Sequence, residues 1–155
     1  MKVQTRGGGK WKAALAAYCA QNAEVRVGIL AGASYSGETS TLPVAAIAAV
    51  HEFGAANIPA RSFMRSTLQQ KREEWISAAA WLLRANPGDV RGMLAMVGET
   101  AAKDMQAAIE AGIGPPLKPA TVKAKLRRKG GKGRPDLPLV DTGTMQEAIS
   151  YEVLP

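Results

Sequence analysis

The tripeptide Asp-Thr-Gly at residues 141–143 is the arrangement in which aspartic proteases carry a catalytic carboxylate. Such an enzyme needs two aspartates that meet across a dyad and share a proton, each on a loop braced by long β-strands. The chain has no second Asp-Thr-Gly, and its helix-rich pattern offers no such scaffold. A structural turn accounts for the same sequence. It would have an Asx turn at Asp141, a positive φ at Gly143 and a capping box from Thr144 to Glu147. We therefore expect Asp141 to shape a turn.

The pair His51-Glu52 is a second candidate, because zinc peptidases carry a His-Glu pair on a helix. Their motif needs another histidine four residues later, but position 55 is alanine and His51 is the only histidine. We expect His51 and Phe53 to pack at the end of an apolar helix, with Glu52 as a surface or interface acid. Two glycine-rich stretches, residues 7–9 and 130–133, lack the spacing of a phosphate-binding loop. We expect no catalytic, metal or cofactor site and no enzymatic activity.

Positive charge is concentrated in one segment. The net charge of the chain is +7, yet residues 118–134 alone contribute +8 and contain no acid. Such a basic arm attracts polyanions, and binding to DNA phosphates would be independent of base sequence and sensitive to salt. A solvated loop, or docking on an acidic protein, explains the charge equally well. The basic residues are Lys118, Lys123, Lys125, Arg127, Arg128, Lys129, Lys132 and Arg134.

The elements that position these residues follow from apolar periodicity. Residues 1–10 read as a flexible lead-in, 11–22 as a helix with Cys19 buried, and 34–42 as a loop. A strand is predicted for EVRVGIL at 24–30, where Val25, Val27 and Ile29 share one face. Further helices are predicted from Pro43 toward Phe53 with Gly54 at the end, from Arg61 to Ala85, from Asp89 to about 111, from Pro119 to near Gly130, and around Met145. A last strand, ISYEVL, closes the chain.

Two apolar stripes define the long helices. In the first, Met64, Leu68, Trp75, Ala79 and Leu82 fall on one side, and in the second Val90, Met93, Val97, Ala101, Met105 and Ile109 recur at three- and four-residue steps. Helices and strands do not alternate regularly, which favours an α+β fold with a small mixed or antiparallel sheet against two long helices. The length of 155 residues suits a single domain over 1–155, with the basic arm at 118–136 inside it. No segment reaches the ~20 apolar residues of a membrane helix, so we expect a soluble protein made in a reducing compartment, without membrane partners.

Four strings occur together in order: VRVGIL, AAVHEFGAANIPARSFMR, GPPLKPATVKAK and PLVDTGTMQEAISYEV. This set, over residues 24 to 154, resembles the tail-completion or virion-morphogenesis proteins of tailed bacteriophages, which include head-tail joining proteins. The chain departs from the family at Ser62, where proline often follows the arginine, and at Lys118, where serine is common. The matching positions that we take as interface candidates are His51, Glu52, Phe53, Gly54, Pro59, Arg61, Phe63, Met64, Pro116, Leu117, Pro119, Asp141, Thr142, Gly143 and Tyr151. Ala60, Thr121, Pro138 and Leu139 also match the family.

The resemblance implies a small α+β protein that completes the tail end and forms part of the neck between head and tail. It implies a homo-oligomeric ring, a hexamer by the symmetry of the tail, around a channel for DNA. The implied partners are a tail terminator or tail tube protein, a head-closure or connector protein, and transient non-specific contacts between double-stranded DNA and the basic arm. The implied location is the virion, after assembly in the bacterial cytoplasm. Alternatives are a basic DNA-binding or packaging accessory protein, and a tail terminator or head-closure protein of the same neck.

Overall fold

The computed structural model describes residues 23–30, 32, 43–127 and 134–155 of the chain. The predicted helix at 11–22 and loop at 34–42 lie outside these residues. The described part combines helices with a two-stranded antiparallel sheet, which confirms the predicted α+β class. In chain order its elements are β1 (Glu24–Ile29), α2 (Val44–Phe53), α3 (Phe63–Ala85), α4 (Val90–Ala111), α5 (Pro119–Arg127), α6 (Thr144–Glu147) and β2 (Ile149–Leu154).

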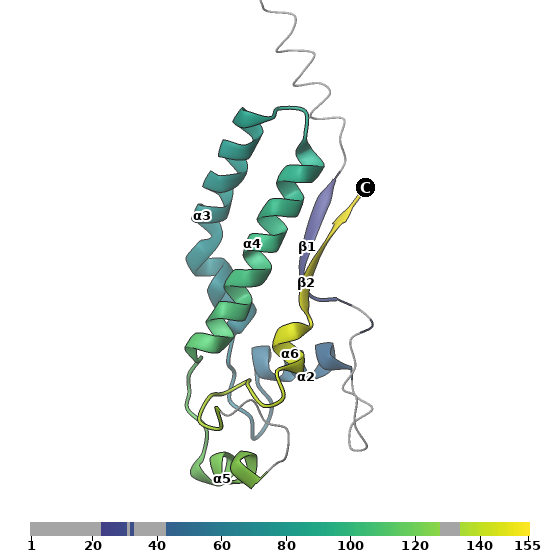
Figure 1. The fold of residues 1–155 in the computed structure, drawn as a ribbon. Coiled ribbons are helices and arrows are strands. Elements are labelled where there is room, and N and C mark those ends of the chain that lie inside the picture. Colours follow the sequence, from purple (N-terminus) through teal and green to yellow (C-terminus); the bar gives the residue numbers. More distant parts are fainter. Residues whose placement is uncertain (1–22, 31, 33–42, 128–133) are drawn as a thin grey trace, which may run out of the picture.

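Helices α3 and α4 form a long hairpin, with α4 between α3 and the sheet (Figure 1). The turn between them ends at Asp89, whose carboxylate accepts a hydrogen bond from the backbone N–H of Gly92 at 2.8 Å. This is the predicted N-cap, which satisfies a donor that the first helical turn leaves open. Across the hairpin, the indole Nε1 of Trp75 donates to Asp104 Oδ2 at 2.7 Å. A polar contact therefore fixes the alignment of two helices that otherwise pack through small and apolar side chains.

The sheet joins two strands that lie far apart in the sequence. β1 pairs with β2 so that Val25 faces Val153, and Val27 faces Tyr151. These side chains lie toward α4, where Gly98 is buried directly beneath them. A Cβ atom at Gly98 would lie 2.6 Å from Val25 Cγ2 and 2.8 Å from Tyr151 Cδ2. The absence of a side chain at this helical position therefore sets how closely the sheet approaches α4.

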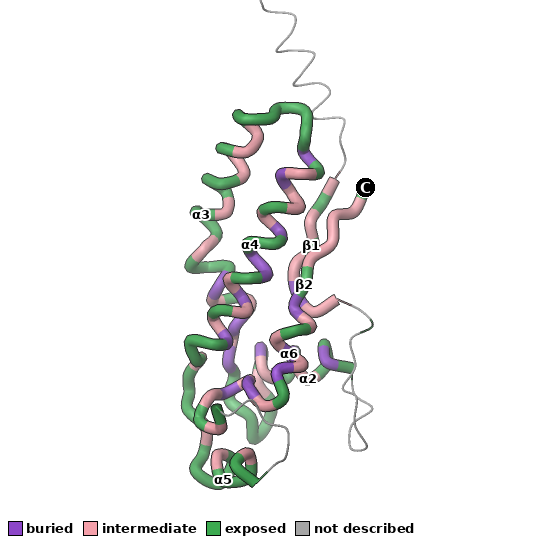
Figure 2. The backbone as a smooth tube through the Cα atoms, viewed as in Figure 1, coloured by how far each residue is buried: buried purple, intermediate pink, exposed green. Residues whose placement is uncertain are grey.

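The core is densest at the end of the hairpin remote from its turn (Figure 2). Phe63, Ile109 and Val44, from three different helices, are the largest fully buried side chains there. Burying each of them stabilises the fold by roughly 1.5–3 kcal/mol. The other members of this cluster are Ala48, Ala102, Met105, Val140, Met145 and Ile149.

The apolar stripe predicted for α3 is only partly correct. Trp75, Ala79 and Leu82 are half-buried, but Leu68 is 49% exposed. Thr67 is buried in its place, one residue earlier along the helix. Helix α3 also begins at Phe63 rather than at Arg61. The stripe of α4 is confirmed, since Val90, Met93, Ala101, Met105 and Ile109 are all buried.

Candidate functional site

Three segments that are distant in sequence meet at the end of the molecule that carries α2, α5 and α6 (Figure 1). They are residues 47–65, 113–125 and 137–145, which hold the second string, the third string and the first half of the fourth. Gly54, with φ of 81°, ends α2, and a reciprocal backbone pair between Ala55 and Ile58 folds the chain back. The backbone N–H of Arg61 consequently donates to His51 O at 2.6 Å. The HEFG and PARS segments thus run side by side.

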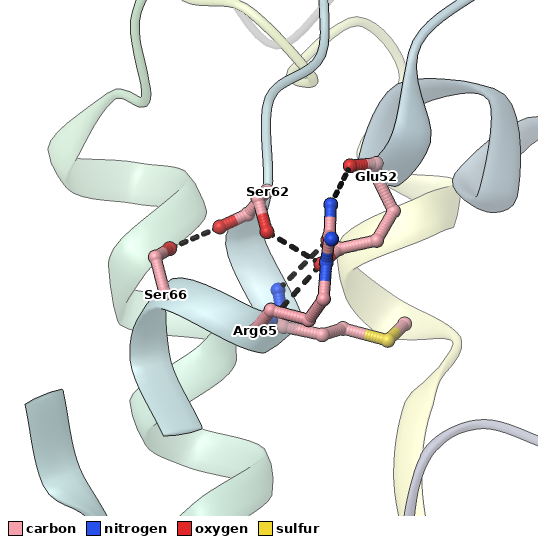
Figure 3. A network of polar contacts seen from close by, with 5 residues as sticks. Glu52, Ser62, Arg65 and Ser66 are labelled. Carbon is pink, nitrogen blue, oxygen red and sulfur yellow. Dashed lines mark hydrogen bonds and ion pairs between the residues drawn. The ribbon is translucent and has the colours of Figure 1, made fainter. Parts of the chain in front are cut away.

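Glu52 caps helix α3 from outside that helix (Figure 3). Its Oε1 accepts hydrogen bonds from Ser62 Oγ at 2.6 Å and from Arg65 N at 3.0 Å, and its Oε2 accepts one from Met64 N at 3.0 Å. The Arg65 side chain adds two hydrogen bonds to Glu52, with its Nε donating to Oε1 at 3.0 Å and its Nη2 donating to the backbone O at 2.8 Å. Ser66 Oγ donates to Ser62 O in the same network. A carboxylate here meets the open N–H groups and the positive end of α3.

The expectations for Glu52 and Phe53 were therefore wrong. Glu52, expected at the surface, is 4% exposed, whereas Phe53, expected to pack inside, is 67% exposed with Arg65 over its ring at 4.6 Å. Burial by itself raises the pKa of Glu52. The hydrogen bonds from Ser62, Arg65 and Met64 outweigh burial, and together they lower the pKa below its usual value. Glu52 is thus held ionised as a structural anion between two helices.

Arg61 is the second buried charge of this region. Arg61 is 5% exposed. Its Nε donates to Pro115 O at 2.9 Å, and its Nη2 donates to Pro116 O at 3.4 Å. Both partners are neutral carbonyl groups. Within the part of the chain that the structure describes, no carboxylate lies within ion-pair distance of this guanidinium. Arg61 therefore links the end of α2 to the proline pair, and its charge is not neutralised directly.

Lys125 points inward from α5, unlike the other basic residues of that helix. Its Nζ donates to Leu137 O at 2.7 Å and to Val140 O. Burial lowers the pKa of Lys125, the charges of Asp141 and Asp136 raise it in part, and the charge of Arg61 lowers it further. The net result is a pKa below the usual lysine value. Through these two hydrogen bonds, Lys125 connects α5 to residues 137–140, just before Asp141.

Between these groups lies a cleft of about 330 Å³, which we call the Arg61 cleft. Its one described histidine, His51, has an Nδ1 atom that is buried and lacks a hydrogen-bond partner. Burial, followed by the charges of Arg61 and Lys125, lowers the pKa of His51, so the imidazole is neutral near pH 7. The lining residues are Ile47, His51, Arg61, Leu117, Thr121, Lys125, Leu139, Asp141, Thr142, Gly143, Thr144 and Met145.

The Asp-Thr-Gly turn forms one wall of the cleft. Gly143 has φ of 88°, as predicted, and precedes α6. The predicted capping box from Thr144 to Glu147 is wrong, because Thr144 is the first helical residue and Gly143 occupies the cap position. Thr142 Oγ1 lies 2.8 Å from Thr144 Oγ1 instead. Leu139 has φ of 64°, which is costly for a branched side chain and requires support from the surrounding contacts.

Among the remaining candidates, Pro59, Pro116 and Lys118 line a second pocket that shares His51 and Arg61 with the cleft. Pro59, Pro116 and Pro119 are exposed, while Tyr151 lies in β2 against α4. Lys118, Lys123, Arg127 and Arg134 are exposed, and Arg128, Lys129 and Lys132 lie outside the described residues. From the sequence, Lys125 was predicted only as one of the eight positive charges of the basic arm. Its spacing of four residues from Thr121 places both side chains on one face of α5, and this signal could have singled it out.

The polar contacts of this region hold one segment of the chain against another. Among the described residues no group of three or more His, Cys, Asp or Glu side chains could hold a metal ion. No helix in the described ranges is long and apolar enough to cross a membrane. Comparisons with protein-family models, with curated proteins and with solved structures find no match to this chain.

Proposed function

We propose that this chain is a structural subunit of the neck of a tailed bacteriophage, which completes the tail end and joins it to the head. The proposal starts from the four strings that resemble tail-completion proteins. The observation that carries it is the contact among three of these strings: Arg61 of the second bonds to the proline pair of the third, and Lys125 of the third bonds to Val140 of the fourth. The strings therefore share one physical task, which is to build a surface.

That surface has the character of a protein contact region. Phe53, Val50 and Ile58 are exposed apolar residues of α2 and the loop after it, and Leu126 is a fourth on α5. Large apolar residues are also exposed on α3 and α4, but here they lie on the elements that carry the matching strings, and exposed apolar residues near charged ones are typical of surfaces that other proteins cover. In this proposal the subunits form a closed ring, a hexamer, by repeating one head-to-tail contact. A tail tube or terminator protein covers one side and a head-closure protein the other, within the virion.

The outer face of α5 supplies the contact with DNA. Lys118, Lys123 and Arg127 are exposed there, and Arg134 follows across the undescribed residues 128–133. Exposed lysines and arginines meet phosphates without reading bases, and such binding weakens steeply with salt. A lumen lined in this way lets duplex DNA pass without holding it.

Deletion of the gene from its phage, followed by electron microscopy of the lysate, tests the proposal. Filled heads and complete tails that fail to join are the expected result, and the wild-type gene supplied on a plasmid should restore joined particles. Normal virions from the deletion phage would refute the neck role. Normal joining together with defective DNA packaging would support the alternative of a packaging accessory protein.

A further inference from the structure

We propose that the Arg61 cleft binds a carboxylate carried by an acidic segment of a partner protein. The inference deepens the proposed function and rests on it for the partner being a protein of the assembly. It names the chemistry by which that partner is recognised. The carboxylate would lie between Arg61 and Lys125, with its apolar stem against the walls of the cleft.

The first support is the unbalanced charge of Arg61. A buried guanidinium is normally paired with an anion, because removal from water costs several kcal/mol that neutral carbonyls offset only in part. The hydrogen bonds of Arg61 use Nε and Nη2, so Nη1 has no such partner among the described residues. Arg61 is 5% exposed and nevertheless lines the cleft. An incoming carboxylate would supply the missing anion.

The second support is the charge of the whole cleft. Arg61 and Lys125 are both cationic, while Asp141 is the one carboxylate among the described lining residues. The charges of the described lining residues therefore sum to about +1. The unpartnered Nδ1 of His51 and the hydroxyls of Thr121 and Thr142 add polar groups beside it. These groups suit the oxygens of one further carboxylate, which arginine binds in a geometry that lysine alone cannot match.

The third support is shape, which favours an acidic side chain over the phosphates of duplex DNA. The walls include Ile47, Leu117, Leu139 and Met145, so the ligand must present apolar carbon behind its charge. A glutamate with an apolar neighbour does so, because its methylene groups lie behind the carboxylate. Duplex phosphates lie on a broad helical surface, and they cannot reach a guanidinium that is 5% exposed inside the cleft. The strained backbone at Leu139, on the cleft wall, is also typical of ligand-binding sites.

The test uses the isolated chain and NMR of its one histidine, whose imidazole signals are therefore unambiguous. The probe is an acetylated and amidated peptide with one glutamate between two leucines, and its control is the same peptide with glutamine. We expect saturable movement of the His51 signals with the glutamate peptide, and affinity at least about tenfold weaker with glutamine, as for loss of a charge-assisted hydrogen bond. Inorganic phosphate and a short DNA duplex form two further arms.

Two variants place the binding in the cleft. Lys125→Met should weaken the glutamate peptide about tenfold, whereas Lys123→Met, on the exposed face of the same helix, should leave its affinity within twofold. Thr142→Glu introduces a competing carboxylate at the rim of the cleft and should block the glutamate peptide, while Thr142→Gln, which removes the same hydroxyl without adding a charge, should weaken its binding far less. Because Thr142 is exposed, this pair decides the question even if the Lys125 variant fails to fold.

Three results would overturn the inference: no movement of the His51 signals, equal affinity for the two peptides, or tighter binding of phosphate or DNA than of the glutamate peptide. These outcomes are independent of the deletion phage. A neck defect without peptide binding removes the inference alone, and peptide binding by a protein whose deletion leaves virions normal removes the neck role alone.

Discussion

The replacement Glu52→Gln tests how much one buried carboxylate stabilises the junction of α2 and α3. Glutamine keeps the size of the side chain but carries an NH₂ group in place of one oxygen. Whichever way the amide turns, that NH₂ group faces a donor, either Met64 N or the pair Ser62 Oγ and Arg65 N. At least one buried donor is then left without an acceptor.

The magnitude follows from these contacts. An unsatisfied buried donor costs about 1–3 kcal/mol. Loss of the negative charge at the N-terminus of α3 adds about 0.3–1 kcal/mol, and more where the site is partly buried. The ion pair with Arg65 adds little, because the Arg65 side chain is 58% exposed and water screens it. We expect a loss of about 2–4 kcal/mol in the free energy of unfolding, or a Tm lower by roughly 5–15 °C for a chain of this size.

Urea and thermal unfolding, followed by far-UV circular dichroism at pH 7, measure the change. Glu74→Gln is the matched control on the exposed face of α3, where Glu74 pairs with Lys71 at 2.9 Å, and it should leave the Tm unchanged. Because hydrogen bonds lower the pKa of Glu52, its contribution is complete above the usual value of 4.5 and disappears as pH falls through the lower, folded-state pKa. The gap between wild type and variant should therefore close in acid. A Tm within 1 °C of wild type at pH 7, or a gap that persists at pH 2, would refute the reasoning, 1 °C being about the shift expected for well under 1 kcal/mol.

Three further changes have definite expected results. Gly98→Ala should lower the free energy of unfolding by about 1–2 kcal/mol in urea titrations, because overpacking against Val25 and Tyr151 outweighs the better helix propensity of alanine; a more stable variant would contradict the close packing of the sheet on α4. Acidification below pH 6.5 should destabilise the protein, because burial lowers the pKa of His51 in the folded state and the unfolded chain therefore takes up the proton first. In the same assay, His51→Gln should make the free energy of unfolding less dependent on pH between pH 7 and pH 5. Asp141→Ala should lower the Tm, because it removes a charge that favours protonated Lys125, and it should leave peptide cleavage at background in both proteins; cleavage by wild type that the variant loses would restore the protease hypothesis.

Local patterns predicted the parts of the fold that local contacts determine. The stripe of α4, the cap at Asp89 and the positive φ of Gly143 all follow from spacing or from the conformational needs of single residues. The alternation in β1 likewise predicted the face that packs on α4. Its pairing with β2 could not be derived in the same way, because the strands are separated by nearly the whole described chain and only the fold sets their register.

The candidate site was less predictable, because its key residues are charged and buried. Statistics place glutamate, arginine and lysine at the surface, and they do so here for most of the chain. Glu52 can be buried because it accepts hydrogen bonds from open backbone N–H groups of α3. Arg61 can be buried because it donates to the carbonyl groups of Pro115 and Pro116. The partners of Arg61 lie 54 and 55 residues away, and the backbone partners of Glu52 lie 12 and 13 residues away beyond the turn after α2, so neither contact shows as a periodic pattern in the sequence.

The placement of residues 137–145 also sets when the Arg61 cleft can form. The α3–α4 hairpin relies on neighbouring segments and can form while the chain is still being synthesised. The Arg61 cleft and the sheet both need residues that leave the ribosome after the hairpin, Asp141 to Met145 and then β2. A chain that terminates before residue 137 lacks one wall of the cleft and the second strand. Under the proposal of a carboxylate-binding cleft, such a truncated chain cannot compete with the complete protein for the partner.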